Sequence, residues 1–148
     1  MTNSEANIYV WKPVSDSLST ENLKGKFYIR STSFDCDGFK IVLNKDTVPQ
    51  KAILINFSGA AYSYRITEKT LSLHLLKAHA IVKKEEQSSA WAFFKLENSE
   101  YLKWVSHQSD KISEDLKLAH YAIWTEDWVI EILSSAEPKV EFFDIKSE

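Results

Sequence analysis

Cysteine, glycine and proline are all scarce in this chain, and each scarcity excludes a class of protein. The single cysteine has no partner for an intrachain disulfide and cannot form a zinc site of several cysteines. Three glycines and three prolines are too few for a collagen-like or low-complexity chain. The glycines, Gly25, Gly38 and Gly59, also stand too far apart for a glycine-rich phosphate-binding loop.

Long apolar runs are missing as well. The longest stretches, such as Ala52–Ile55, have the length of a β-strand, whereas a membrane-spanning helix needs about 20 apolar residues. The first seven residues are polar and include an acid, unlike the basic and apolar regions of a secretory signal. We therefore expect a cytoplasmic protein without a membrane span.

The chain does contain the material for a hydrophobic core. Of its 148 residues, 44% are hydrophobic and 13% aromatic, with five tryptophans. This length suits one domain and is short for two. We expect a single globular domain over residues 1–148, with residues 1–7 and 145–148 frayed.

The pattern of apolar side chains predicts a mainly β protein. Alternation or strong β propensity indicates strands near residues 8–11, 27–30, 39–43, 52–57, 62–66, 91–96, 118–124 and 139–143. Residues 31–38 read as a turn-rich loop in which Gly38 permits a positive φ. Two alternatives remain for residues 70–80: the alternation of Leu71, Leu73 and Leu75 favours a hairpin, whereas Leu71, Leu75 and Ala78 also fit a helix.

Two short helices are expected near the C-terminal third. Ser99 is placed as an N-cap before Glu100, and Tyr101, Leu102 and Val105 share a helical face. Residues 106–115 are polar and predict a loop. A second helix is expected after Thr125, with an apolar face formed by Trp128, Val129, Ile132 and Leu133. The predicted fold is therefore α+β, a mainly antiparallel sheet with both helices against one face.

Motifs for catalysis and metal binding are weak. No Gly-x-Ser-x-Gly motif occurs. Cys36 lies between Asp35 and Asp37, which would raise the pKa of its thiol and oppose activation. The segment 35–38 resembles the start of a calcium loop but lacks the later ligands, and His74 and His79 have unproductive spacing for a metal. We expect no catalytic residue, no metal and no cofactor.

Charge is divided unevenly along the chain. Residues 1–109 hold 14 basic and 11 acidic residues, a net charge of +3, and residues 110–148 hold 4 and 10, a net charge of −6. Acids beside exposed aromatic side chains would suit a basic protein partner. The residues expected to contact it are Glu126, Asp127 and Glu131 on the outer side of the second helix, with Glu137 and Glu141 beyond it. The alternative is that these acids are only solvated while the aromatics face the core.

A group of basic residues in the first third of the chain is the feature that would favour nucleic-acid binding. Lys24, Lys26, Arg30 and Lys40 stand among aromatic residues, without an RNA-binding motif. The overall charge of −3 opposes general nucleic-acid binding. An RNA-binding accessory would require these four residues to gather on one face.

Several sequence blocks together resemble a known kind of protein. These blocks are 56–57, 64–68, 97–101 and 118–141. They look like a family of small uncharacterised bacterial proteins that is similar in size and acidity to immunity proteins of polymorphic toxin systems. The resemblance implies a non-enzymatic protein that masks the active site of a cognate toxin; no catalytic residue is carried over.

A second hypothesis stays open beside this one. The chain could be a small-ligand-binding module or a diverged enzyme with a pocket lined by tryptophan and tyrosine. A cleft that holds His74 or His120 with a carboxylate in hydrogen-bond range would favour it. The aromatic content would also suit a homodimer interface.

Overall fold

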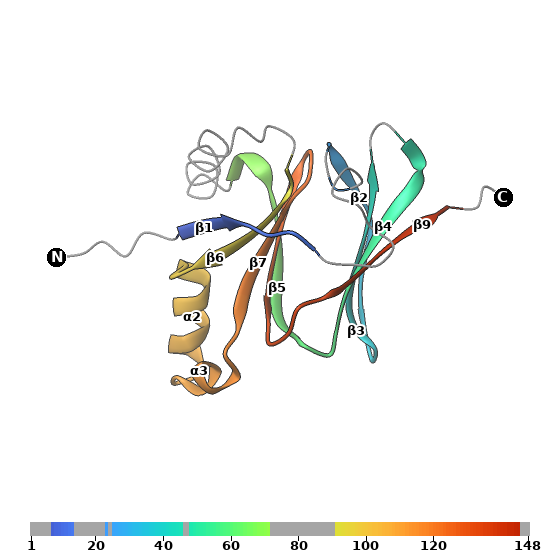
Figure 1. The fold of residues 1–148 in the computed structure, drawn as a ribbon. Coiled ribbons are helices and arrows are strands. Elements are labelled where there is room, and N and C mark those ends of the chain that lie inside the picture. Colours follow the sequence, from blue (N-terminus) through green and yellow to red (C-terminus); the bar gives the residue numbers. More distant parts are fainter. Residues whose placement is uncertain (1–6, 14–22, 24, 46–47, 72–90, 146–148) are drawn as a thin grey trace.

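A computed structural model of the chain describes residues 7–13, 23, 25–45, 48–71 and 91–145. Nine strands in these ranges form two antiparallel sheets that face each other (Figure 1). The first sheet has the order β2-β3-β4-β9, and its strands are β2 (Phe27–Asp35), β3 (Gly38–Lys45), β4 (Val48–Ser58) and β9 (Lys139–Asp144).

The second sheet has five strands in the order β1-β6-β7-β8-β5. Their bounds are β1 (Asn7–Val10), β5 (Ala61–Glu68), β6 (Phe93–Glu97), β7 (Ala119–Trp124) and β8 (Trp128–Ser134). A short 3-10 turn, η2 (Lys69–Leu71), follows β5. Helices α2 (Glu100–Gln108) and α3 (Ile112–Leu116) connect β6 to β7 and lie on the side of this sheet that faces away from the other sheet (Figure 1).

The hydrophobic core lies between the two sheets, and both contribute to it. The ring of Tyr121 in β7 packs edge-on against Phe57 of β4, with centroids 5.4 Å apart, and against Trp11 at 4.9 Å. Phe27 of β2 meets Phe93 of β6 at 5.5 Å in the same way. Such edge-to-face pairs add to the stabilisation that the buried area supplies.

Several sequence predictions are confirmed. The fold is α+β and its sheets are antiparallel. The first predicted helix is α2, and its N-cap Ser99 accepts a hydrogen bond from the Leu102 N–H at 3.1 Å. Residues 35–38 form a turn in which Gly38 has a φ of +98°. A Cβ at Gly38 would come within 1.8 Å of the Ser58 carbonyl oxygen, so the turn requires glycine.

The second predicted helix is wrong, because the segment after Thr125 is strand β8. The Thr125 hydroxyl accepts a hydrogen bond from the Trp128 N–H at 3.1 Å. A helix N-cap makes the same bond to the residue three positions later. The Thr125 hydroxyl also donates to the Trp128 carbonyl at 2.7 Å, and this closes a hairpin turn between β7 and β8. Strand β8 is paired on both sides and buried on both faces, so its sequence lacks the alternation of a half-exposed strand.

Two loop predictions also need correction. Residues 31–35 continue β2 instead of forming a loop. The predicted loop 106–115 contains the end of α2 and most of helix α3, which spans residues 112–116. The alternatives for residues 70–80 lie almost entirely outside the described residues. In the part of the chain that the structure describes, no helix has both the length and the apolar character to cross a membrane.

Candidate functional site

A partly buried ion pair joins strands β5 and β8. Arg65 and Glu131 are direct partners in the β5–β8 register, on the sheet face that carries α2. The Arg65 Nε lies 2.5 Å from Glu131 Oε2, and Nη2 lies 3.1 Å from Oε1. The carboxylate side chain is 2% exposed and the arginine 48% exposed. A bidentate pair of this kind fixes direction as well as charge.

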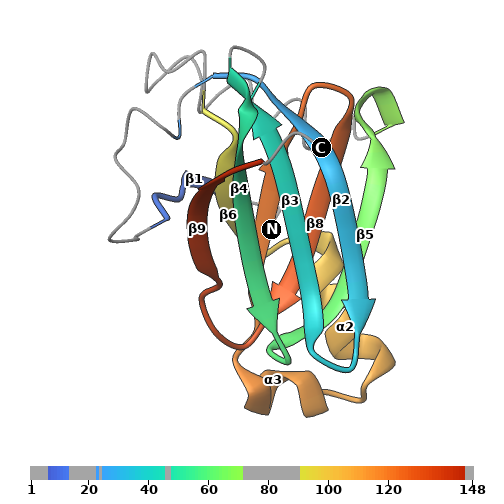
Figure 2. The ribbon, with the colours of Figure 1, turned by 90° about the vertical axis from the view of Figure 1, so that its right-hand side faces the viewer.

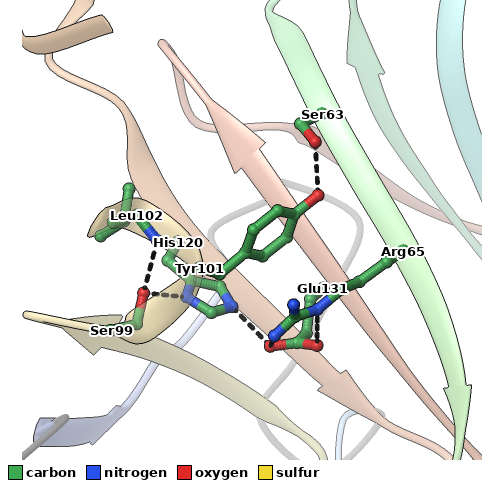
Figure 3. A network of polar contacts seen from close by, with 7 residues as sticks. All are labelled: Ser63, Arg65, Ser99, Tyr101, Leu102, His120 and Glu131. Carbon is green, nitrogen blue, oxygen red and sulfur yellow. Dashed lines mark hydrogen bonds and ion pairs between the residues drawn. The ribbon is translucent and has the colours of Figure 1, made fainter. Parts of the chain in front are cut away.

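His120 on β7 approaches the same carboxylate from the other side (Figure 3). Its Nε2 lies 3.0 Å from Glu131 Oε1, a close contact without the alignment of a hydrogen bond. The residue opposite Glu131 on β7 is Ala122, whose small side chain leaves room for this diagonal approach. The imidazole Nδ1 lies 2.7 Å from the Ser99 hydroxyl.

Helix α2 is attached to the sheet through this network. The Ser99 hydroxyl serves both His120 and the first turn of α2, and a hydroxyl can do so because it offers one donor and two acceptor positions. The Tyr101 ring lies 4.1 Å from the Arg65 guanidinium carbon, a cation–π contact. The Tyr101 hydroxyl reaches the Ser63 hydroxyl at 2.5 Å.

The network holds Glu131 in its charged form. Burial raises the pKa of Glu131, but the close His120 imidazole and the hydrogen-bonded Arg65 guanidinium outweigh it, so the pKa lies below its ordinary value of 4.5. Burial raises the pKa of the Tyr101 phenol, so this group remains a neutral hydroxyl. Glu131 therefore contributes a buried negative charge with two basic neighbours.

Ser99, His120 and Glu131 have the composition of a hydrolase triad, but their surroundings do not suit catalysis. All three are buried, at 3%, 1% and 2% exposure. The Ser99 hydroxyl is also the cap of α2, and none of the three lines the cavity between α2 and α3 or the cavity between the sheets. The histidine–carboxylate contact that the hypothesis of a ligand cleft requires is therefore present, but both of its residues are buried. The alternative residue, His74, lies outside the described residues.

Glu131 does not lie on an exposed helix face, contrary to the prediction. The residue is in strand β8, and its carboxylate is enclosed by Arg65 and His120. A partner in solution cannot reach it in this conformation. Its contacts are with residues of the neighbouring strands, so we do not include it in the docking surface proposed below.

The other four predicted acids occupy separate places. Glu126 and Asp127 form the turn between β7 and β8. Glu137 lies beyond the opposite end of β8, roughly 20 Å away along the strand, and its carboxylate pairs with Lys95 at 3.1 Å. Glu141 lies on β9, in the other sheet, and is exposed. Only the first two form a local pair.

Exposed aromatic side chains mark a different surface, where the edge strands β2 and β5 lie on one side of the sandwich (Figure 2). Tyr64 of β5 is 5.9 Å from Phe34 of β2 and stacks on Phe39 at 4.1 Å. Further along, a cavity of about 350 Å³ opens between the sheets. It is lined by Tyr28, Ile29, Ile66, Thr125, Asp127 and Trp128.

We call this surface the inter-edge groove and define it by Tyr28, Ile29, Phe34, Tyr64, Ile66 and Trp128. Phe34, Tyr64 and Trp128 expose 63%, 40% and 43% of their surface. The Glu126 N–H donates to the Phe27 carbonyl at 2.9 Å, which ties the acidic turn to β2 at one end of the groove. The sequence could not reveal this surface, because it depends on which strands are edges.

The predicted basic group does not form one surface. Lys26 lies at the start of β2, 4.0 Å from the Glu126 carboxylate. Lys40 faces Ser33 at the other end of the β2–β3 hairpin, about 20 Å away. Lys24 lies outside the described residues. These placements give no support to an RNA-binding face.

A larger cavity of about 540 Å³ lies between α2 and α3. Its lining contains three lysines, two carboxylates and a few apolar side chains, so it shows no strong preference for either anionic or cationic ligands. The lining comprises Asn98, Leu102, Lys103, Val105, Ser106, His107, Asp110, Lys111, Ser113, Glu114, Lys117 and Leu118.

Comparisons with known proteins found no matching family model, no matching curated protein and no matching solved structure.

Proposed function

We propose that this chain is a non-enzymatic protein-interaction domain that docks a basic protein partner along the inter-edge groove. The observation that carries the proposal is the group of exposed aromatic side chains between the edge strands β2 and β5. Aromatic anchors at the centre of a surface, with charges around them, are typical of protein interfaces. An exposed apolar patch of this kind is unusual on a protein without a partner.

The charges at one end of the groove favour a basic partner. Asp127 lines the cavity beside Trp128, and Glu126 and Glu68 lie at the same end of the sheet. Lys26 and Lys69 are close by, so the acidity is local and modest. Such a charge would steer a basic partner and orient it more than it would add affinity.

The concrete form of this proposal is an immunity protein that covers the active site of a cognate toxin. The sequence resemblance described above and the acidic C-terminal quarter support it. If the toxin is a nuclease, its substrate site is basic, and Asp127 and Glu126 would occupy the place of phosphate charges. Cytoplasmic location agrees with this role and is part of the proposal.

Capture of a partner tests this function. The tagged protein is used to isolate binding proteins from its native cells in low and in high salt, and each captured protein is then assayed alone and with an equimolar amount of this chain. We expect one stoichiometric basic protein, retained less well in high salt, whose activity is lost in the complex. A captured partner that stays fully active would refute the immunity role, and the absence of a stoichiometric partner would refute the interaction role.

A second candidate is a ligand-binding domain, which the α2–α3 cavity favours because of its volume and mixed lining. A metabolite screen by thermal shift distinguishes it. A ligand that raises the melting temperature of the wild type, but not that of a Val105→Trp variant with a filled cavity, would favour this candidate.

A further inference from the structure

We propose that the partner docks by strand addition: an extended basic segment pairs with the open edge of β5 and lengthens the five-stranded sheet. This inference rests on the proposed function and specifies how its surface is used. Strand addition supplies main-chain hydrogen bonds, while alternate side chains of the added segment enter neighbouring pockets.

Strand β5 is an edge strand with little protection against pairing. It pairs with β8 on one side, and no described strand pairs with its other side. Its register with β8 is regular from Ser63 to Glu68. The edge strand β2 is interrupted by a bulge between Ile29 and Ser31, β1 has only four residues, and β9 carries three charged residues among its six. Bulges and short lengths protect edges from pairing, and β5 has neither along this stretch.

Charged protection is also sparse on β5, whose charged residues are Arg65 and, at its end, Glu68. Within the strand, Arg65 is the one cation, and its guanidinium is held on the opposite sheet face by Glu131 and Tyr101. An arginine fixed in this way cannot turn toward an incoming strand. The residues of this regular stretch that face the groove, Tyr64 and Ile66, are aromatic and apolar.

The groove provides a floor for the side chains of an added strand. A new strand would run about 4.8 Å from β5. Its inward side chains would lie beside Tyr64, which is 40% exposed, and over Phe34 of β2. Aliphatic or β-branched residues at alternate positions would cover these rings.

Charge at the Glu68 end sets the chemistry of the segment. The described residues provide no ion pair for the Asp127 carboxylate, which lines the cavity next to Ile66. Lys26 is engaged by Glu126 at 4.0 Å, and Lys69 donates to the Glu126 carbonyl at 3.4 Å. A lysine or arginine of the added segment would therefore find Asp127 as its partner.

A synthetic peptide tests strand addition without the natural partner. The peptide has eight residues, the length of β5, with alternating valine and threonine and a lysine at each end. Two derivatives carry N-methyl groups on alternate amides, one in each of the two registers, because only one set of amides can face β5. Affinity is measured by titration, and amide hydrogen exchange of residues 61–68 is measured in the free protein and in the complex.

We expect the two methylated derivatives to bind with different affinities. The parent peptide and one methylated derivative bind, the other derivative binds at least about tenfold more weakly, and β5 amides exchange more slowly in the complex. A Tyr64→Lys variant loses binding, whereas Phe143→Lys keeps it. Phe143 is a matched control because it is a 39% exposed strand aromatic on β9, in the other sheet. Circular dichroism of both variants shows whether they fold.

Two results would overturn the inference. Equal effects of the two methylation patterns, with unchanged exchange in β5, would mean that side chains alone occupy the groove; the proposed function would then stand without strand addition. No peptide binding up to about millimolar concentration, with a captured partner that still binds wild type and Tyr64→Lys alike, would refute both the strand addition and the groove.

Discussion

The Glu131 carboxylate lies 2.5 Å from the Arg65 Nε because the two residues face each other across β5 and β8. His120 reaches the same carboxylate from β7, so three neighbouring strands meet at one buried charge. Through Ser99, the first turn of α2 joins them. This cluster fixes the register of β5, the strand whose outer edge we propose as the docking site.

Removal of the charge on Glu131 should destabilise the protein. In Glu131→Gln, Arg65 and His120 lose the carboxylate that both face. We expect a loss of about 2–3 kcal/mol in the free energy of unfolding, less than for a fully buried pair because Arg65 is half-exposed to water. Urea denaturation at pH 7 measures this loss. In the matched variant Glu137→Gln the carboxylate is exposed, and the change should stay within about 0.5 kcal/mol. Equal effects of the two variants would contradict the account.

Stability should fall at acid pH because of the same residue. The pKa of Glu131 is lower in the folded protein than its ordinary value of 4.5. Its stabilising contribution is therefore fully present above pH 4.5 and is lost as the pH falls through the lower folded-state pKa. Urea denaturation between pH 7 and pH 3 should show a steeper loss for the wild type than for Glu131→Gln. Parallel curves for the two proteins would exclude Glu131 as a source of this acid sensitivity.

Ser99 should contribute more than an ordinary helix cap. In Ser99→Ala, α2 loses its N-cap, which costs about 1 kcal/mol, and the buried His120 Nδ1 loses its partner, which costs about 1–3 kcal/mol more. Ser99→Thr retains a hydroxyl and should recover most of the loss. Thermal unfolding of the two variants compares them. If Ser99→Ala lost only the stability of a helix cap, about 1 kcal/mol, the His120 contact would contribute nothing.

Charge reversal should show that the acidic turn, and not the other predicted acids, guides the partner. Asp127→Lys should slow association with a basic partner by about tenfold and make the association rate less dependent on salt, because a steering charge is removed. Glu141→Lys makes the same change in charge on β9, away from the groove, and should have little effect. Stopped-flow association rates at two salt concentrations provide the measurement. Equal slowing by both variants would mean that net charge, not the groove, guides the partner.

The sequence predicted much of the fold and little of the site. Strands with one buried face, such as β3 with Phe39, Ile41 and Leu43, alternate and were identified correctly. Ser99 was also identified, because capping is a local interaction. Strand β8 was assigned to a helix because both of its faces are buried and because Thr125 makes the same local contact in a turn as in a helix cap.

The site was missed for a related reason. A charged residue inside an apolar segment, as at Glu131, signals a buried partner if the segment is a strand, but an exposed face if it is a helix. The wrong assignment of β8 therefore placed Glu131 on the surface. The inter-edge groove brings together residues of β2, β5 and β8 that are up to a hundred positions apart, and no local pattern encodes the order of strands in a sheet.

The central claim is that this groove receives the partner, and a side-by-side binding measurement tests it most directly. The captured partner is titrated by calorimetry with the wild type, Tyr64→Lys and Phe143→Lys, each first shown to fold by circular dichroism. We expect Tyr64→Lys to weaken binding by at least about a hundredfold, as for a central aromatic anchor, and Phe143→Lys to match the wild type. Wild-type affinity in Tyr64→Lys, or a loss confined to Phe143→Lys, would contradict the account.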